Sequence, residues 1–431
     1  MTPDQPPEPP GPHVGPDQGT DPSHGRAARG LVMRRQRPVN NLLLGTAVSR
    51  IGDSITLIAL IWIMFERTQS AGGVALVQFA YTILIPIGGL LVGGVLDRFR
   101  VVPVMIADTF AKAAVILAVL LADLAGFAVV PVTLVAALYL GLTWMVGGAG
   151  LPTLIAGAVE PGDHPRANLF DSLAYSFSAV AGPLIAGILI STITAPGALV
   201  AGSICSIAYG LLLFDVRNDL LSHVPPASLG AVGVHGIAEG FRLILRSPLL
   251  LSLTLMFVSL NAISTLYAVV LPVYAAQTLN VGAAGYTLLL SVNSIGAMAG
   301  TIIGRWLSPR IGVGRAIIGA IALGGLLFLP MLLVTTLAGA AVVLFVQGLV
   351  ASGYGPWIQT LRMRVIPPHL RSRAFGSIRT MTNSLAPFAA LAAAGILPAV
   401  GIAGVWILIT AWWVATAIGL AFVRDLRQSR T

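Results

Sequence analysis

The chain has 431 residues, of which 56% are hydrophobic and only 10% are charged, and its mean hydropathy is +0.89. A soluble globular protein carries about 25% charged residues, so this composition excludes an ordinary soluble enzyme. The net charge is +9, but the basic residues are spread over many short segments without a basic-aromatic block, which indicates contact with a membrane face rather than with nucleic acid.

Residues 1–38 are rich in Pro, Gly and Asp. Such a segment cannot bury enough apolar surface to fold, so we expect a disordered tail on the cytoplasmic side. From residue 40 onward, long apolar segments alternate with short polar hinges. Each segment is long enough to cross a hydrocarbon core of roughly 30 Å as a helix. Twelve transmembrane helices are predicted, at 41–64, 73–96, 101–123, 129–151, 168–192, 197–215, 248–276, 283–307, 314–336, 339–362, 376–397 and 401–423.

The basic residues are distributed unequally between alternate gaps. Of the 25 Lys and Arg residues, all but Arg67, Arg50 and Lys112 fall in segments predicted to be cytoplasmic or at the cytoplasmic ends of helices. Positive charge near helix ends is retained on the cytoplasmic side of a membrane. We therefore expect a multi-pass protein of the cell membrane with both termini in the cytoplasm, including the short tail 424–431.

The two parts of the chain repeat each other. Similar stretches recur at an offset of roughly 200 residues, which predicts two pseudo-symmetric six-helix halves, 39–215 and 248–423, around a site at the membrane midplane. The central segment 216–247 is predicted to be a cytoplasmic linker. Its stretch Gly236 to Arg246 is amphipathic, and a surface helix joining the halves is favoured there over a regulatory site.

A glycine-rich segment with a charged end spans the end of the second predicted helix and contains Gly89, Gly93, Asp97, Arg98 and Arg100. It resembles the loop signature of the major facilitator superfamily. Glycines allow helices to approach closely, and arginines at the end of a helix stay among the lipid headgroups. The resemblance implies a twelve-helix transporter fold and a gating role for this loop.

The chain over roughly residues 40–423 is also similar to the branch of that superfamily that includes macrolide and enterobactin exporters. One block in the fifth predicted helix, with Gly182, Pro183 and Gly187, resembles an antiporter motif found in exporters. A proline bends a membrane helix and flanking glycines permit tight packing, so a purely structural kink explains these residues equally well. The expectation of export comes from the resemblance.

Few ionisable residues lie within the predicted helices. Charges at this depth are costly and are usually functional. Arg50 and Asp53 share a face of the first helix, and Asp108 and Lys112 share a face of the third. Asp53 is the first candidate for binding a proton or cation, with a neutralised Arg50–Asp53 pair as the equal alternative. Asp108 and Lys112 are expected to form a structural pair. Asp171 is expected to be a charge at a helix N-terminus.

Helices one, four, seven and ten line the central cavity in the family that this chain resembles. A wide cavity with aromatic and sparse polar groups suits an amphiphilic cargo. The candidates for lining it are Trp144, Asn261, Ser264, Tyr267, Asn293, Gln347, Tyr354 and Trp357.

These expectations favour a secondary transporter that exports a small amphiphilic compound, such as a drug, an antibiotic or a siderophore-like molecule, by proton antiport. An importer or facilitator of the same fold, or a sensor that transports nothing, remains open. We expect a monomer without a cofactor. Cys205 is the only cysteine, and no Walker loop, nucleophile or metal cluster stands out, so no enzymatic activity is expected.

Overall fold

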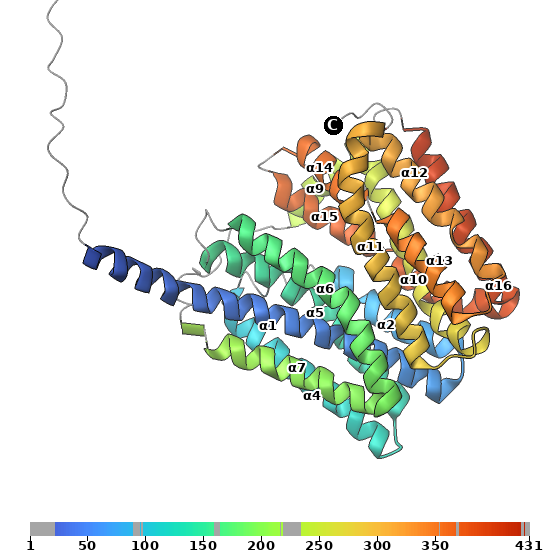
Figure 1. The fold of residues 1–431 in the computed structure, drawn as a ribbon, viewed down its shortest axis with the longest axis horizontal. Coiled ribbons are helices and arrows are strands. Elements are labelled where there is room, and N and C mark those ends of the chain that lie inside the picture. Colours follow the sequence, from blue (N-terminus) through green and yellow to red (C-terminus); the bar gives the residue numbers. More distant parts are fainter. Residues whose placement is uncertain are drawn as a thin grey trace, which may run out of the picture.

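The computed structural model describes residues 22–88, 95, 98–158, 164–215, 217–218, 234–352, 354–367, 370–423 and 426, and every regular element in these ranges is a helix. Figure 1 shows two helical bundles that meet near one end and diverge toward the other. The first bundle contains α1 (Pro22–Thr68), α2 (Ala71–Ile83), α4 (Val101–Leu124), α5 (Val129–Ala158), α6 (His164–Thr192) and α7 (Ala195–Asp215).

The second bundle is joined to the first through α9 (Val234–Arg246), which lies in the segment predicted to link the halves. There Glu239 forms an ion pair with Arg373, so α9 is held against the start of α15. The helices of the second bundle are α10 (Pro248–Gln277), α11 (Ala283–Ile311), α12 (Val313–Leu326), η2 (Leu329–Leu332), α13 (Leu337–Ala351), α14 (Tyr354–Val365), α15 (Arg371–Asn383) and α16 (Ala386–Ala421).

The all-helical membrane fold predicted from the sequence is confirmed. Within the described ranges, ten helices are long and apolar enough to cross a membrane. Two features account for the difference from the twelve expected spans. The last two predicted helices run together as one continuous apolar segment that bends at Gly401, where φ is +70°. The tenth predicted helix is divided into α13 and α14, and α13 alone is shorter than a full span.

Two helices end four residues before a proline, at positions that the hydropathy pattern did not predict. A proline ring collides with the carbonyl four residues earlier, so a helix tends to end there. The helix α12 ends at Leu326, four residues before Pro330, although the sequence predicted a helix to residue 336. In the same way α15 ends at Asn383, four residues before Pro387, inside the predicted helix 376–397.

The first helix is longer than expected. The sequence predicted disorder over residues 1–38, whereas α1 begins at Pro22 and extends beyond the first bundle (Figure 1). No proline occurs between Pro22 and Pro38, and proline suits the first helical position because its missing N–H has no partner to lose there. Residues 1–21 lie outside the described part of the chain.

Equivalent helices pack in the same way in the two halves. The second half repeats the contact of α2 with α5 as α11 with α13, and that of α4 with α7 as α12 with α16. A β-carbon at Gly141 of α5 would overlap the carbonyl oxygen of Tyr81 on α2, and one at Gly300 of α11 would overlap that of Leu349 on α13. Only glycine permits this approach of two backbones, and both halves use it at the same pair of helices.

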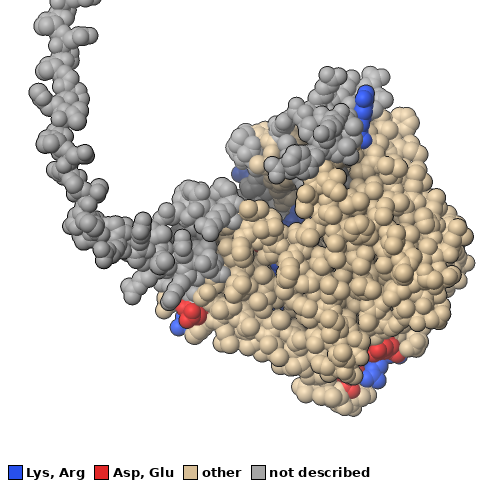
Figure 2. All heavy atoms as spheres, in the orientation of Figure 1, with Lys and Arg blue, Asp and Glu red and all other residues tan. Residues whose placement is uncertain are grey.

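The two halves touch mainly through α6 against α11 and α2 against α16. Near the end of the molecule where the bundles converge, Gly187 faces Thr287, and the ring of Trp62 stacks on that of Tyr286 at 6.1 Å between centroids. Toward the other end the bundles diverge, and Figure 2 shows basic side chains inside the hollow between them. The molecule is therefore closed at one end and open toward the end where α9 and α15 lie.

Candidate functional site

A large cavity has a volume of about 440 Å³ and is lined almost entirely by the first half. Helices α1, α2, α4, α5, α6 and α7 all contribute to it, and Arg379 of α15 is the single contribution of the second half among the lining residues. The charged and aromatic residues of this wall are Arg50, Asp53, Tyr81, Asp108, Lys112, Trp144, Tyr175, Tyr209 and Arg379.

Lys112 lies between two carboxylates. Its Nζ atom is 3.3 Å from Oδ2 of Asp108, one turn earlier on α4, and 3.8 Å from Oδ2 of Asp53 on α1. The side chain of Asp108 is only 7% exposed and also accepts a hydrogen bond from the Tyr139 hydroxyl at 3.1 Å. The side chain of Asp53 is 40% exposed, to the cavity that it lines. One buried lysine thus serves two carboxylates, of which Asp53 is the accessible one.

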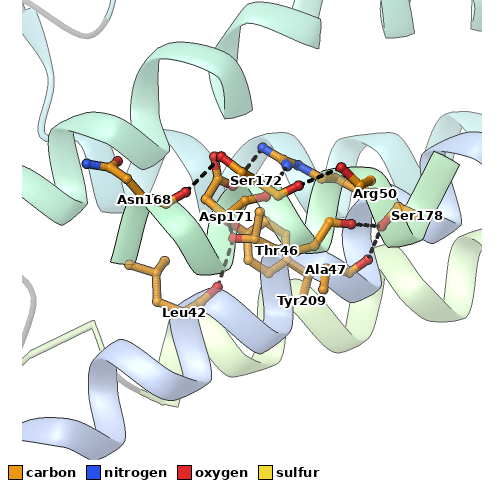
Figure 3. A network of polar contacts seen from close by, with 11 residues as sticks. Leu42, Thr46, Ala47, Arg50, Asn168, Asp171, Ser172, Ser178 and Tyr209 are labelled. Carbon is orange, nitrogen blue, oxygen red and sulfur yellow. Dashed lines mark hydrogen bonds and ion pairs between the residues drawn. The ribbon is translucent and has the colours of Figure 1, made fainter. Parts of the chain in front are cut away.

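Arg50 does not pair with Asp53, contrary to one of the two alternatives that the sequence left open. Its guanidinium reaches Asp171 of α6, 2.9 Å from the carboxylate and 3.1 Å from the backbone oxygen (Figure 3). The guanidinium carbon also lies 5.3 Å from the ring centre of Tyr175. Asp171 is therefore not a helix-terminal charge, since α6 begins seven residues earlier at His164. Spacing within one helix could not reveal the contacts of Arg50 with Asp171 and Tyr175, because both contacts join α1 to α6.

Arg379 is a cavity residue that the sequence did not reveal. The hydropathy pattern placed it among the positive charges at a cytoplasmic helix end, yet it lies two turns into α15. Its guanidinium carbon is 4.6 Å from the ring centre of Trp144, and a β-carbon at Gly148 would lie 2.9 Å from its Nη2. Arg379 falls in the first turn of the predicted helix 376–397, so nothing in the sequence indicated its depth. Its contact with Trp144 across the two halves could be found only from the structure.

A second, smaller cavity of about 160 Å³ lies within the second half. The amide of Asn293 donates hydrogen bonds to Oε1 of Gln347 at 2.8 Å and to the carbonyl of Leu344 at 2.9 Å. No charged residue is among those lining this cavity within the described ranges. They are Ile263, Ser264, Tyr267, Asn293, Phe328, Gln347, Gly348, Ala351, Ser352 and Trp413.

The predicted lining residues are thus divided between two cavities. Trp144 lines the large one, whereas Ser264, Tyr267, Asn293 and Gln347 line the small one. Asn261 instead donates to the backbone oxygen of Thr382, which ties α10 to α15. Trp357 packs against the hydrophobic core, and the side chain of Tyr354 lies outside the described part of the structure.

None of the described motif residues is among those that line the large cavity. Gly182 faces Ser54 of α1, Gly187 faces Thr287 of α11, and Pro183 remains within α6, so this block serves close helix packing in the structure. Of the loop motif, Arg98 and Arg100 are exposed, whereas Gly89, Gly93 and Asp97 lie outside the described residues. No group of three His, Cys, Asp or Glu side chains within the described ranges is placed to hold a metal ion.

A family model described as Major Facilitator Superfamily matches residues 42–391. The chain belongs to this superfamily. It is similar to the multidrug efflux pump Tap of Mycolicibacterium fortuitum, at 26% identity over 91% of this chain and 97% of that protein. Tap of Mycobacterium tuberculosis strain H37Rv is also 26% identical, over 90% of this chain and 94% of the relative.

Solved structures agree with the superfamily fold. A mutant of the nucleoside transporter NupG superposes with a TM-score of 0.70 at 13% identity, covering 89% of this chain and 99% of that one. A transporter of the POT family in complex with a thioalcohol-conjugated peptide gives 0.72 at 12% identity, covering 91% and 97%. At these identities the structures establish the fold alone. The protein is thus a multi-pass membrane transporter of the major facilitator superfamily, as the loop motif indicated.

Proposed function

We propose that this superfamily member exports a small amphiphilic organic compound from the cytoplasm in exchange for protons, by rocking its two halves. The observation that carries this proposal is the cluster of Asp53, Lys112 and Asp108 on the wall of the large cavity. The similarity to Tap, named a multidrug efflux pump, supports the direction of transport. The distribution of basic residues supports a cell-membrane location with both termini in the cytoplasm.

The charges of the cluster fit an exchange of protons for cargo. Two carboxylates and one ammonium leave an excess negative charge when all three are ionised. A proton on Asp53 removes that excess and leaves Lys112 paired with Asp108 at 3.3 Å, so the buried lysine keeps its partner. A cationic group of a cargo at the exposed Asp53 carboxylate would remove the same excess. Cargo and proton therefore compete for one site, which is the requirement of antiport.

The direction in which the cavity opens fits loading from the cytoplasm. The halves are in contact at the end that carries Trp62 and Tyr286, whereas they diverge toward the end with α9 and α15. If α9 is cytoplasmic, as the positive charges predict, this conformation receives cargo from inside the cell. Rocking of one half against the other around the site would then expose Asp53 to the outside.

Transport into everted membrane vesicles tests the proposal. Vesicles that contain the protein are energised by respiration, and uptake of ethidium and norfloxacin is followed by fluorescence. Uptake above that of vesicles without the protein, abolished by a protonophore, is expected. Uptake that survives complete collapse of the proton gradient would disprove the coupling, and movement in the opposite direction would identify an importer.

A further inference from the structure

The large cavity contains a cation without a carboxylate partner. Three cations and two carboxylates line it, namely Arg50, Lys112 and Arg379 against Asp53 and Asp108. Arg50 is neutralised by Asp171, and Lys112 is shared by Asp53 and Asp108. Arg379 forms no ion pair with any described residue, and the partner of its guanidinium is the face of Trp144.

The surroundings of Arg379 fix its guanidinium and leave the donors free. An aromatic ring at 4.6 Å holds the planar group by a cation–π contact, which uses the face of the group and not its N–H donors. The adjoining backbone at Gly148 leaves room where any side chain would crowd Nη2. A guanidinium held in this way presents a flat edge of several donors, the arrangement that binds carboxylate or phosphate in a bidentate manner.

Arg379 brings the N–H donors of its guanidinium from the second half to a cavity of the first half. All other residues of the cavity wall belong to the first half, whereas Arg379 belongs to α15 of the second. A ligand bound to Arg379 within this cavity would therefore contact both halves at once. A ligand that contacts both halves can bias their relative position, because its contacts differ between the two conformations of the transporter.

We infer that the transported compound carries an acidic group, a carboxylate or another planar oxyanion, that binds Arg379. This inference rests on the proposed function, in which Asp53 receives a basic group of the same compound. The cargo class is then a zwitterionic amphiphile, with its basic group at Asp53, its acidic group at Arg379 and its apolar body along Leu57, Met105 and Leu140.

The test measures binding, so that it is independent of transport. Norfloxacin, which carries both a basic amine and a carboxylate, is compared with its methyl ester, which lacks only the acid, by calorimetry on the purified protein in lipid nanodiscs. The wild type is expected to bind the acid roughly ten-fold or more tightly than the ester, as a charge-assisted hydrogen bond implies. Arg379→Gln should bind both compounds with the affinity of the ester.

Two variants complete the design. Arg379→Lys keeps the charge and loses the flat donor edge, so it should retain part of the preference for the acid. Arg315→Gln removes an exposed arginine of α12, outside the residues that line the cavity, and should leave the preference unchanged. Thermal unfolding of each variant shows whether it is folded.

The outcomes separate the inference from the proposed function. Equal affinity of the wild type for acid and ester, no saturable binding of the acid, or an undiminished preference in a folded Arg379→Gln protein would overturn the inference. Loss of proton-dependent uptake in vesicles, with the acid preference intact, would overturn the proposed function alone.

Discussion

The two halves of this transporter share a helical scaffold but differ in the chemistry of their interiors. Glycine contacts bring α2 against α5 in the first half and α11 against α13 in the second. The cavity of about 440 Å³ in the first half includes charged residues in its wall, whereas the cavity of about 160 Å³ in the second is lined by uncharged side chains. The repeated scaffold therefore determines how the helices of each half pack, while ionisable groups in the first half supply the candidate site for coupling.

The largest effect should follow from removing the shared cation. Lys112→Met leaves two carboxylates at bilayer depth, one of them only 7% exposed, without their positive partner. Breaking a buried pair in this way costs about 3–5 kcal/mol, so thermal unfolding should occur at a clearly lower temperature and transport should be lost. Lys112→Met combined with Asp108→Asn removes a carboxylate as well and should recover part of the stability. A melting temperature equal to that of the wild type for the single variant would contradict the account of the cluster.

A smaller effect, equal in both halves, is expected at the glycine contacts. Gly141→Ala and Gly300→Ala each place a methyl group against a backbone carbonyl of the neighbouring helix, so the helices must separate. Overpacking of this kind costs about 1–3 kcal/mol and should lower the unfolding temperature in both variants.

The control for these glycine variants is Gly319→Ala, where an added methyl group meets open space. It should be neutral or slightly stabilising, because alanine favours helix over glycine. If Gly319→Ala destabilised the protein as much as Gly141→Ala, close approach would not be the cause.

The smallest effect is expected in the uncharged cavity. Gln347→Leu removes the acceptor at 2.8 Å from the Asn293 amide, which still donates to Leu344. The loss of one neutral hydrogen bond costs about 1 kcal/mol, so a small decrease in stability should be found. Uptake in vesicles should keep the proton dependence of the wild type, and a loss of that dependence would show that the second half also takes part in coupling.

The fold could be predicted from the sequence because the length of apolar segments and the distribution of arginines report directly on the membrane. The helix ends at Leu326 and Asn383 were missed because hydropathy alone does not register the steric demand of Pro330 and Pro387. Proline positions alone would not have identified these two ends, because other prolines remain inside helices, namely Pro152, Pro183, Pro272 and Pro398.

The site was predicted only in part. Asp53 and the Asp108–Lys112 pair could be named because charges in apolar helices are rare and because a separation of four residues places two side chains on one face. The partner of Arg50 and the contact of Arg379 with Trp144 depend on how separate helices pack, and one sequence carries no direct record of those distances.

The most direct test of the central claim, that cargo and a proton compete at Asp53, is the release of protons when cargo binds. Ethidium, whose positive charge is permanent, is added to purified protein in weakly buffered solution with a pH indicator. The wild type should release roughly one proton per bound molecule at a pH where Asp53 is protonated, and Asp53→Asn should bind ethidium without release. Equal proton release from both proteins would contradict the assignment of coupling to Asp53.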